Sequence, residues 1–131
     1  MRTTNNGNYG FSHCNGSTTG SQVYEMIGNT FINCGQYGIY SLTRNSNGAR
    51  GKIWNNYFRG DWRSTSARAI YMGYDRNFDV WANTVVMQNN LTNAGAGIYI
   101  YPSNYANDVT NNNIVVSGTG SSGYTLYSEG G

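Results

Sequence analysis

The fold is decided by the heptapeptide Asp79-Val80-Trp81-Ala82-Asn83-Thr84-Val85 and by its gapless copies elsewhere in the chain. Every copy begins with a charged residue and then an apolar one, and has asparagine at the fifth position and an apolar residue at the seventh. The other copies are Glu25–Phe31, Lys52–Phe58 and Asp108–Ile114. Their fifth-position asparagines are Asn29, Asn56, Asn83 and Asn112, at intervals of 27, 27 and 29 residues. A nearly fixed period of this size indicates a repeat architecture.

A second motif falls once between successive copies of the first. It reads Gly38-Ile39-Tyr40, Ala69-Ile70-Tyr71, Gly97-Ile98-Tyr99 and Thr125-Leu126-Tyr127, with a weaker early copy at Gly10-Phe11-Ser12. Both motifs are short and rich in β-formers, and Gly, Asn and Ser separate them, as expected for strands joined by turns. The chain has too few leucines for a leucine-rich repeat, and a propeller blade needs four strands. The pattern predicts a β-solenoid in which each coil pairs in parallel with the next, about 4.8 Å away.

These motifs resemble the parallel β-helix repeat of the pectate-lyase-like superfamily, over residues 9 to 128. The resemblance implies an all-β, right-handed, single-stranded parallel β-helix of four to five three-sided coils, each about 28 residues long. Residues 1–131 then form a single domain, with a fragment of a longer solenoid as the open alternative. The superfamily contains lyases, hydrolases, esterases, tailspikes, adhesins and structural proteins, so the resemblance predicts a fold and selects no activity.

The period also predicts which residues share a face. Asparagine tolerates positive φ and forms hydrogen-bonded ladders, so the four fifth-position asparagines are expected to stack at one bend of every coil. Four columns are expected to face inward: Met26, Ile53, Val80 and Val109; Phe31, Phe58, Val85 and Ile114; Phe11, Ile39, Ile70, Ile98 and Leu126; and the smaller Gly28, Asn55, Ala82 and Asn111.

Three columns are expected to face outward: Tyr40, Tyr71, Tyr99 and Tyr127; Ile27, Trp54, Trp81 and Thr110; and Glu25, Lys52, Asp79 and Asp108. The tyrosine column has two interpretations. It is an aromatic ladder that stabilises the sheet, or a platform of flat rings with polar tips that contacts carbohydrate or protein. Asp79 and Asp108 would be neighbouring like charges, either solvated or able to attract a cation such as Ca²⁺.

No catalytic residue is predicted. Glycoside hydrolysis usually needs two carboxylates, and none aligns on the tyrosine strands apart from the terminal Glu129. The alternative is a polysaccharide lyase or glycoside hydrolase, or a fragment of one, that uses the long segment Arg59–Arg68. Within it Asp61 would be a lone metal ligand, Trp62 would stack on sugar, and Arg63 or Arg68 would bind a carboxylate. The candidate ligand-binding residues are therefore Tyr40, Tyr71, Tyr99, Tyr127, Asp61, Trp62, Arg63 and Arg68.

Composition limits the partners. Charged residues are 11% of the chain and the net charge is +2, which argues against nucleic acid as the main partner. No apolar run approaches the roughly 18 residues of a membrane span. Cys14 and Cys34 lack metal-ligand spacing, so they are buried thiols or a disulfide, and neither a metal nor another cofactor is predicted.

The sequence therefore favours a non-catalytic structural or carbohydrate-contacting module, with an extracellular or cell-surface location favoured over others. Polysaccharide is the expected ligand. Neither terminus shows a helical cap, and the chain stops soon after the strand-like Thr125-Leu126-Tyr127. Because open ends of a solenoid expose unpaired backbone groups, self-association through the ends is also expected.

Overall fold

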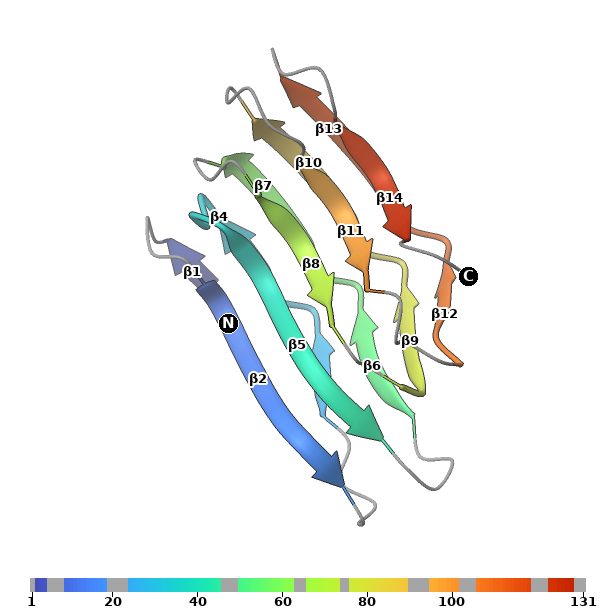
Figure 1. Cartoon of the computed structure of the whole chain (residues 1–131). Helices are drawn as coiled ribbons and strands as arrows, with labels where there is room; N and C mark the ends of the chain where they lie inside the picture. Colours follow the sequence, from blue (N-terminus) through green and yellow to red (C-terminus); the bar gives the residue numbers. More distant parts are fainter. Residues whose placement is uncertain are drawn as a thin grey trace.

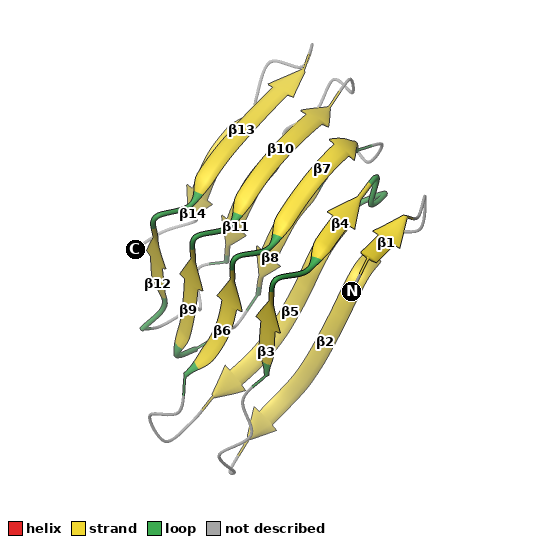
Figure 2. Cartoon of the chain, turned by 180° about the vertical axis from the view of Figure 1, so that it is seen from behind, coloured by secondary structure: helices red, strands yellow, loops and turns green. Residues whose placement is uncertain are grey.

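The computed structural model describes residues 2–4, 9–18, 24–45, 50–62, 66–73, 76–89, 95–101, 106–118 and 123–128. Within these ranges every regular element is a β-strand, and the strands pair in parallel in three sheets (Figures 1 and 2). No helix in this part of the chain is long and apolar enough to cross a membrane.

The chain visits the three sheets in a fixed order, C, A and then B. Sheet C contains β3 (Glu25–Ile27), β6 (Gly51–Trp54), β9 (Phe78–Trp81) and β12 (Asp108–Thr110). Sheet A contains β1 (Arg2–Thr4), β4 (Thr30–Ile32), β7 (Tyr57–Asp61), β10 (Thr84–Asn89) and β13 (Asn113–Gly118). Sheet B contains β2 (Tyr9–Thr18), β5 (Tyr37–Asn45), β8 (Arg68–Met72), β11 (Ala96–Ile100) and β14 (Tyr124–Ser128). The predicted all-β solenoid of stacked parallel coils is confirmed at this level.

The strand register brings together the residues that the period aligns. Ile53 pairs with Met26 and Val80, Phe58 pairs with Phe31 and Val85, and Ile70 pairs with Ile39 and Ile98. These side chains form one continuous core along the axis, and the Phe31 and Phe58 rings stack at 4.7 Å between centroids. Each coil therefore buries its apolar groups against its neighbours, as in other solenoids.

The predicted asparagine column is also present. The Oδ1 atom of Asn56 accepts from the backbone N–H of Asn29 at 3.0 Å, and the same contact links Asn83 to Asn56 and Asn112 to Asn83. The Nδ2 atoms of Asn29, Asn56 and Asn83 also donate to the Oδ1 of the next asparagine, at 2.9 to 3.1 Å. In Asn56, Asn83 and Asn112, Nδ2 also donates to a carbonyl of the preceding coil. The ladder supplies buried backbone groups at the bend with hydrogen-bond partners.

Two details of this bend were wrongly predicted. Positive φ belongs to the residue before each ladder asparagine, with values of 67° at Gly28, 51° at Asn55, 53° at Ala82 and 53° at Asn111. These four residues also do not form an inward column, because Gly28, Asn55 and Asn111 are exposed and Ala82 is half-buried. The buried position belongs to the ladder, where Asn56 and Asn83 are almost fully covered. The residue with positive φ changes the direction of the chain at the bend, and the side chain of the asparagine that follows it points inward.

Candidate functional site

The four predicted tyrosines form a continuous stack on the outer face of sheet B. Ring centroids are 5.0 Å apart between Tyr40 and Tyr71, 5.3 Å between Tyr71 and Tyr99, and 5.1 Å between Tyr99 and Tyr127. The ring planes diverge by only 4°, 12° and 19°. Each inner ring is covered on both faces by its neighbours, so the tyrosine ladder presents ring edges rather than ring faces.

Further aromatic side chains flank the ladder at both ends. Tyr37 lies 5.0 Å from Tyr40 and 5.3 Å from Tyr71, and Tyr124 lies 4.9 Å from Tyr127. The sequence analysis did not single out Tyr37 or Tyr124. The available signal was their equal spacing, since each stands three residues before a ladder tyrosine.

The lack of a side chain at Gly38 makes this arrangement possible. A Cβ atom at Gly38 would lie 2.5 Å from the backbone oxygen of Ala69 and 2.7 Å from the Phe58 ring, so any side chain here would collide with the core. Gly38 and Ile39 are both buried, although successive strand residues normally alternate in direction. Tyr37 and Tyr40 consequently share the outer face.

Arg68 lies over the ladder at its centre. Its guanidinium carbon is 4.6 Å from the Tyr99 ring centroid, a cation–π distance, and its Nη1 donates to the Ala67 carbonyl. Burial lowers the pKa of Arg68, while the surrounding tyrosines Tyr99, Tyr37, Tyr71 and Tyr127 oppose that shift. Tyr99 is only 8% exposed as a result of its stacked neighbours and this arginine.

Trp62 differs from its expected role. The sequence suggested an exposed ring that stacks on sugar, but the structure buries Trp62 completely within the core. Its backbone N–H donates to Gln88 at 3.0 Å, which continues the pairing of β7 with β10. Its indole Nε1 has no hydrogen-bond partner among the described residues. In this arrangement the ring fills the interior and cannot contact a ligand.

The other candidates of the 59–68 segment are only partly placed. Asp61 is the last residue of β7 and pairs with Gln88, but its side chain lies outside the described residues. Arg63 lies wholly outside them. Of this segment, Arg68 alone is brought to the tyrosine ladder by the described contacts.

The outer face of sheet C carries paired charges. Lys52 Nζ lies 2.6 Å from Oε1 of Glu25, its neighbour in the predicted outward column. Arg50 joins Asp79 at 2.6 Å and Asp108 at 2.8 Å, and its hydrogen bond to Asp79 raises the pKa of Arg50. The Arg50 guanidinium therefore bridges Asp79 and Asp108, and both carboxylates remain partly solvated. Sequence reasoning missed Arg50 because it stands outside both motifs.

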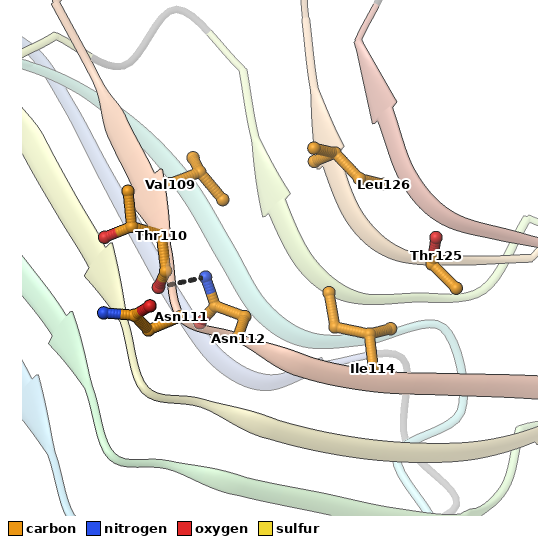
Figure 3. Close-up of a pocket in the computed structure, with 7 residues that line it drawn as sticks. All are labelled: Val109, Thr110, Asn111, Asn112, Ile114, Thr125 and Leu126. Carbon is orange, nitrogen blue, oxygen red and sulfur yellow. Dashed lines mark hydrogen bonds between the residues drawn. The ribbon is translucent and has the colours of Figure 1, made fainter.

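The C-terminal end of the solenoid is hollow. A depression of about 310 Å³ is lined by Val109, Thr110, Asn111, Asn112, Ile114, Thr125 and Leu126 (Figure 3). Val109, Ile114 and Leu126 come from strands of all three sheets and continue the core columns, yet Leu126 is 49% exposed. The backbone N–H of Asn112, unlike those of the three earlier ladder asparagines, has no acceptor within the described structure.

Comparison with protein-family models, with curated proteins and with solved structures gives no match for this chain. The architecture is therefore established by the register of its own strands and by its own hydrogen-bonded ladder.

Proposed function

We propose that this chain is a non-catalytic β-solenoid module that contacts polysaccharide through the outer edge of its tyrosine ladder. The proposal includes a right-handed helix of about 28 residues per coil, as in the pectate-lyase-like superfamily that the repeat resembles, and an extracellular or surface location. Right-handed crossovers between parallel strands are the rule in proteins, which supports the handedness.

The observation that carries the proposal is the stacking of Tyr40, Tyr71, Tyr99 and Tyr127 at 5.0 to 5.3 Å. Because the ring faces cover one another, a ligand would meet the ring edges and the phenolic hydroxyls, and a phenolic hydroxyl both donates and accepts hydrogen bonds. Stacking also fixes the rings before a ligand arrives, which lowers the entropy cost of binding. A rigid row of hydroxyl groups suits a hydroxyl-rich chain, and Arg68 adds a positive group for an acidic sugar.

The carboxylates support a non-catalytic module. Those with described side chains, Glu25, Asp79 and Asp108, lie on sheet C and are paired with Lys52 or Arg50. A glycosidase site instead places two carboxylates on either side of one sugar linkage.

The test is to replace Tyr71 and Tyr99 together with phenylalanine. This change removes two hydroxyls and keeps both rings, so the ladder and the stability should be retained. Binding to neutral and acidic oligosaccharides on a glycan array should weaken. Equal binding by the variant and the natural chain would leave the ladder with a structural role only.

The alternative, a polysaccharide lyase or glycoside hydrolase acting through the 59–68 segment, has a separate test. Incubation with acidic polysaccharides should release products with the absorbance of unsaturated sugars if the chain is a lyase. Shortening of neutral and acidic chains without that absorbance would indicate a hydrolase. Unchanged substrates would support the non-catalytic module.

A further inference from the structure

A second aromatic surface lies on the outer face of sheet C, away from the tyrosine ladder. The register aligns Ile27 with Trp54, Trp54 with Trp81, and Trp81 with Thr110, so one side chain from each strand forms a row that we name the tryptophan stripe. Ile27 is 46% exposed and Trp81 is 43% exposed. Tyr99 in the centre of the tyrosine ladder, by contrast, is only 8% exposed.

The geometry of the two indoles keeps an aromatic face available. Trp54 and Trp81 meet edge to face, with 82° between their planes and 5.6 Å between centroids. In an edge-to-face pair only one ring has a face covered, and that ring keeps its other face. The Lys52 ammonium lies 4.9 Å from the Trp54 ring, so Trp81 is the more accessible of the two.

Neutral polar groups border the tryptophan stripe. Asn55 and Asn111 are exposed at the left-handed bend that directly follows the stripe, and Thr110 is exposed within it. All three of Val109, Thr110 and Asn111 line the hollow at the end of the solenoid, and Figure 3 shows the Thr110 and Asn111 side chains on the other side of the backbone from the Val109 side chain. In the coil between Asn55 and Asn111, the equivalent residue is Ala82, whose small side chain leaves space next to Trp81. Amide and hydroxyl groups both donate and accept hydrogen bonds without charge.

The charges beside the stripe are all held in ion pairs, in which three carboxylates meet two cations and one negative charge is left in excess. Glu25 is paired with Lys52, and Arg50 with both Asp79 and Asp108. A charged ligand would have to compete with these pairs. The excess negative charge repels an acidic ligand, so among polysaccharides a neutral chain suits this surface best.

The tryptophan stripe is one side chain wide, which suits an extended chain better than a protein partner. A stable protein interface buries about 800 Å² on each partner. An interface of that size would extend from this single row over the adjoining ion pairs and would have to desolvate them at a cost. An extended chain lying along the row avoids this cost.

We propose that Trp81 and Trp54, with Thr110 and the amides of Asn55 and Asn111, bind a neutral polysaccharide chain that runs across the strands of sheet C. Successive coils are about 4.8 Å apart, comparable to the length of one hexose unit, so successive sugars meet equivalent positions of successive coils. Indole faces pack against the C–H faces of sugars, while amides and hydroxyls bind the sugar hydroxyls. This site rests on the proposed carbohydrate function and adds a separate surface and ligand class to it.

The experiment uses the full chain with neutral hexasaccharides of glucose, mannose and N-acetylglucosamine, and with hexagalacturonate as the acidic counterpart. Affinity is measured by calorimetry, and tryptophan fluorescence is followed in the same titration. The variant is Trp81→Thr, because Thr110 occupies the same column one coil later. Loss of one stacked aromatic should weaken binding of the best neutral probe about tenfold. Val86→Ala, which truncates a 39% exposed residue on sheet A, is the control and should leave binding unchanged.

Each outcome decides between the two proposals. If the natural chain binds neutral probes and Trp81→Thr binds them equally well, the tryptophan stripe is not the site, whatever the double Tyr71→Phe, Tyr99→Phe variant shows. If the natural chain binds no neutral probe but binds hexagalacturonate, the stripe proposal fails and the carbohydrate function stands. If it binds no saccharide, both fail. Loss of self-association in Trp81→Thr without any saccharide binding would make the stripe a protein contact and overturn the proposal.

Discussion

The carboxamide oxygen of Asn83 accepts two hydrogen bonds from Asn56, one from its backbone N–H and one from its Nδ2, both at 3.0 Å. Both asparagines are buried, so neither group of Asn56 can turn to water instead. The same pair of contacts repeats at the other steps of the ladder. The ladder therefore links coils that are 27 to 29 residues apart in the sequence.

Replacing Asn83 with alanine should strongly destabilise the chain. The change leaves the Asn56 N–H without its acceptor and the Ile53 carbonyl without the Asn83 Nδ2 donor, at a cost of about 2–4 kcal/mol. Urea denaturation followed by circular dichroism measures the loss. The matched control is Asn55→Ala at the exposed bend, where Ala82 already stands one coil later. Comparable losses in the two variants would contradict a specific role for the ladder.

Replacing Ala82 with asparagine should stabilise the chain. Ala82 has φ 53°, a conformation that costs a residue with a Cβ about 1 kcal/mol and that asparagine tolerates better. Asn55 and Asn111 occupy the equivalent positions. Thermal unfolding should shift upward by about 4 °C. A lower melting temperature would show that Ala82 is favoured for another reason.

Replacing Trp62 with phenylalanine should cost much less than replacing it with alanine. The Trp62 Nε1 has no partner in the described part of the chain, so phenylalanine sacrifices no hydrogen bond there. Alanine would leave a large cavity in the core, at about 3–5 kcal/mol. Chemical denaturation of both variants provides the comparison. Equal losses would mean that the indole N–H has a partner that this arrangement does not show.

Replacing Arg50 with glutamine should destabilise the chain by about 1 kcal/mol, since surface ion pairs contribute little and both carboxylates are partly solvated. The loss should shrink at about 1 M salt, where screening weakens the Asp79–Asp108 repulsion. Urea midpoints at low and high salt test both statements. Arg59→Gln, an exposed arginine on sheet A, serves as the control. A salt-independent loss would assign the effect to the hydrogen bonds that Arg50 donates to Phe78 and Ala106.

The open C-terminal hollow predicts association of the chain at high concentration. Leu126 and its neighbours offer apolar surface beside β12, β13 and β14, the last strands of the three sheets in the described part of the chain, and edge strands favour pairing with another chain. Leu126→Lys places a charge there and should reduce the association measured by sedimentation velocity. Val115→Lys, with the same charge at a 50% exposed position on the outer face of sheet A, should change it less. A strictly monomeric natural chain would show that this end is covered.

Most of the architecture followed from the sequence. The heptapeptide copies fixed the columns Met26, Ile53 and Val80 and the stacked ladder of Asn29, Asn56, Asn83 and Asn112, because a parallel solenoid aligns residues one period apart. The tyrosine ladder followed for the same reason, since Tyr40, Tyr71 and Tyr99 share one register. In a repeat of this kind, residues one period apart in the sequence lie side by side in the folded chain.

The tertiary structure alone decided what lies between the repeats. Arg50 reaches Asp108 across 58 residues, and Trp62, which directly follows β7, is buried although it belongs to neither motif. The left-handed position fell one residue before the asparagine, because the bend needs its inward side chain for hydrogen bonds. Such contacts depend on side-chain direction and on local backbone angles. A period specifies neither, and only the folded chain fixes them.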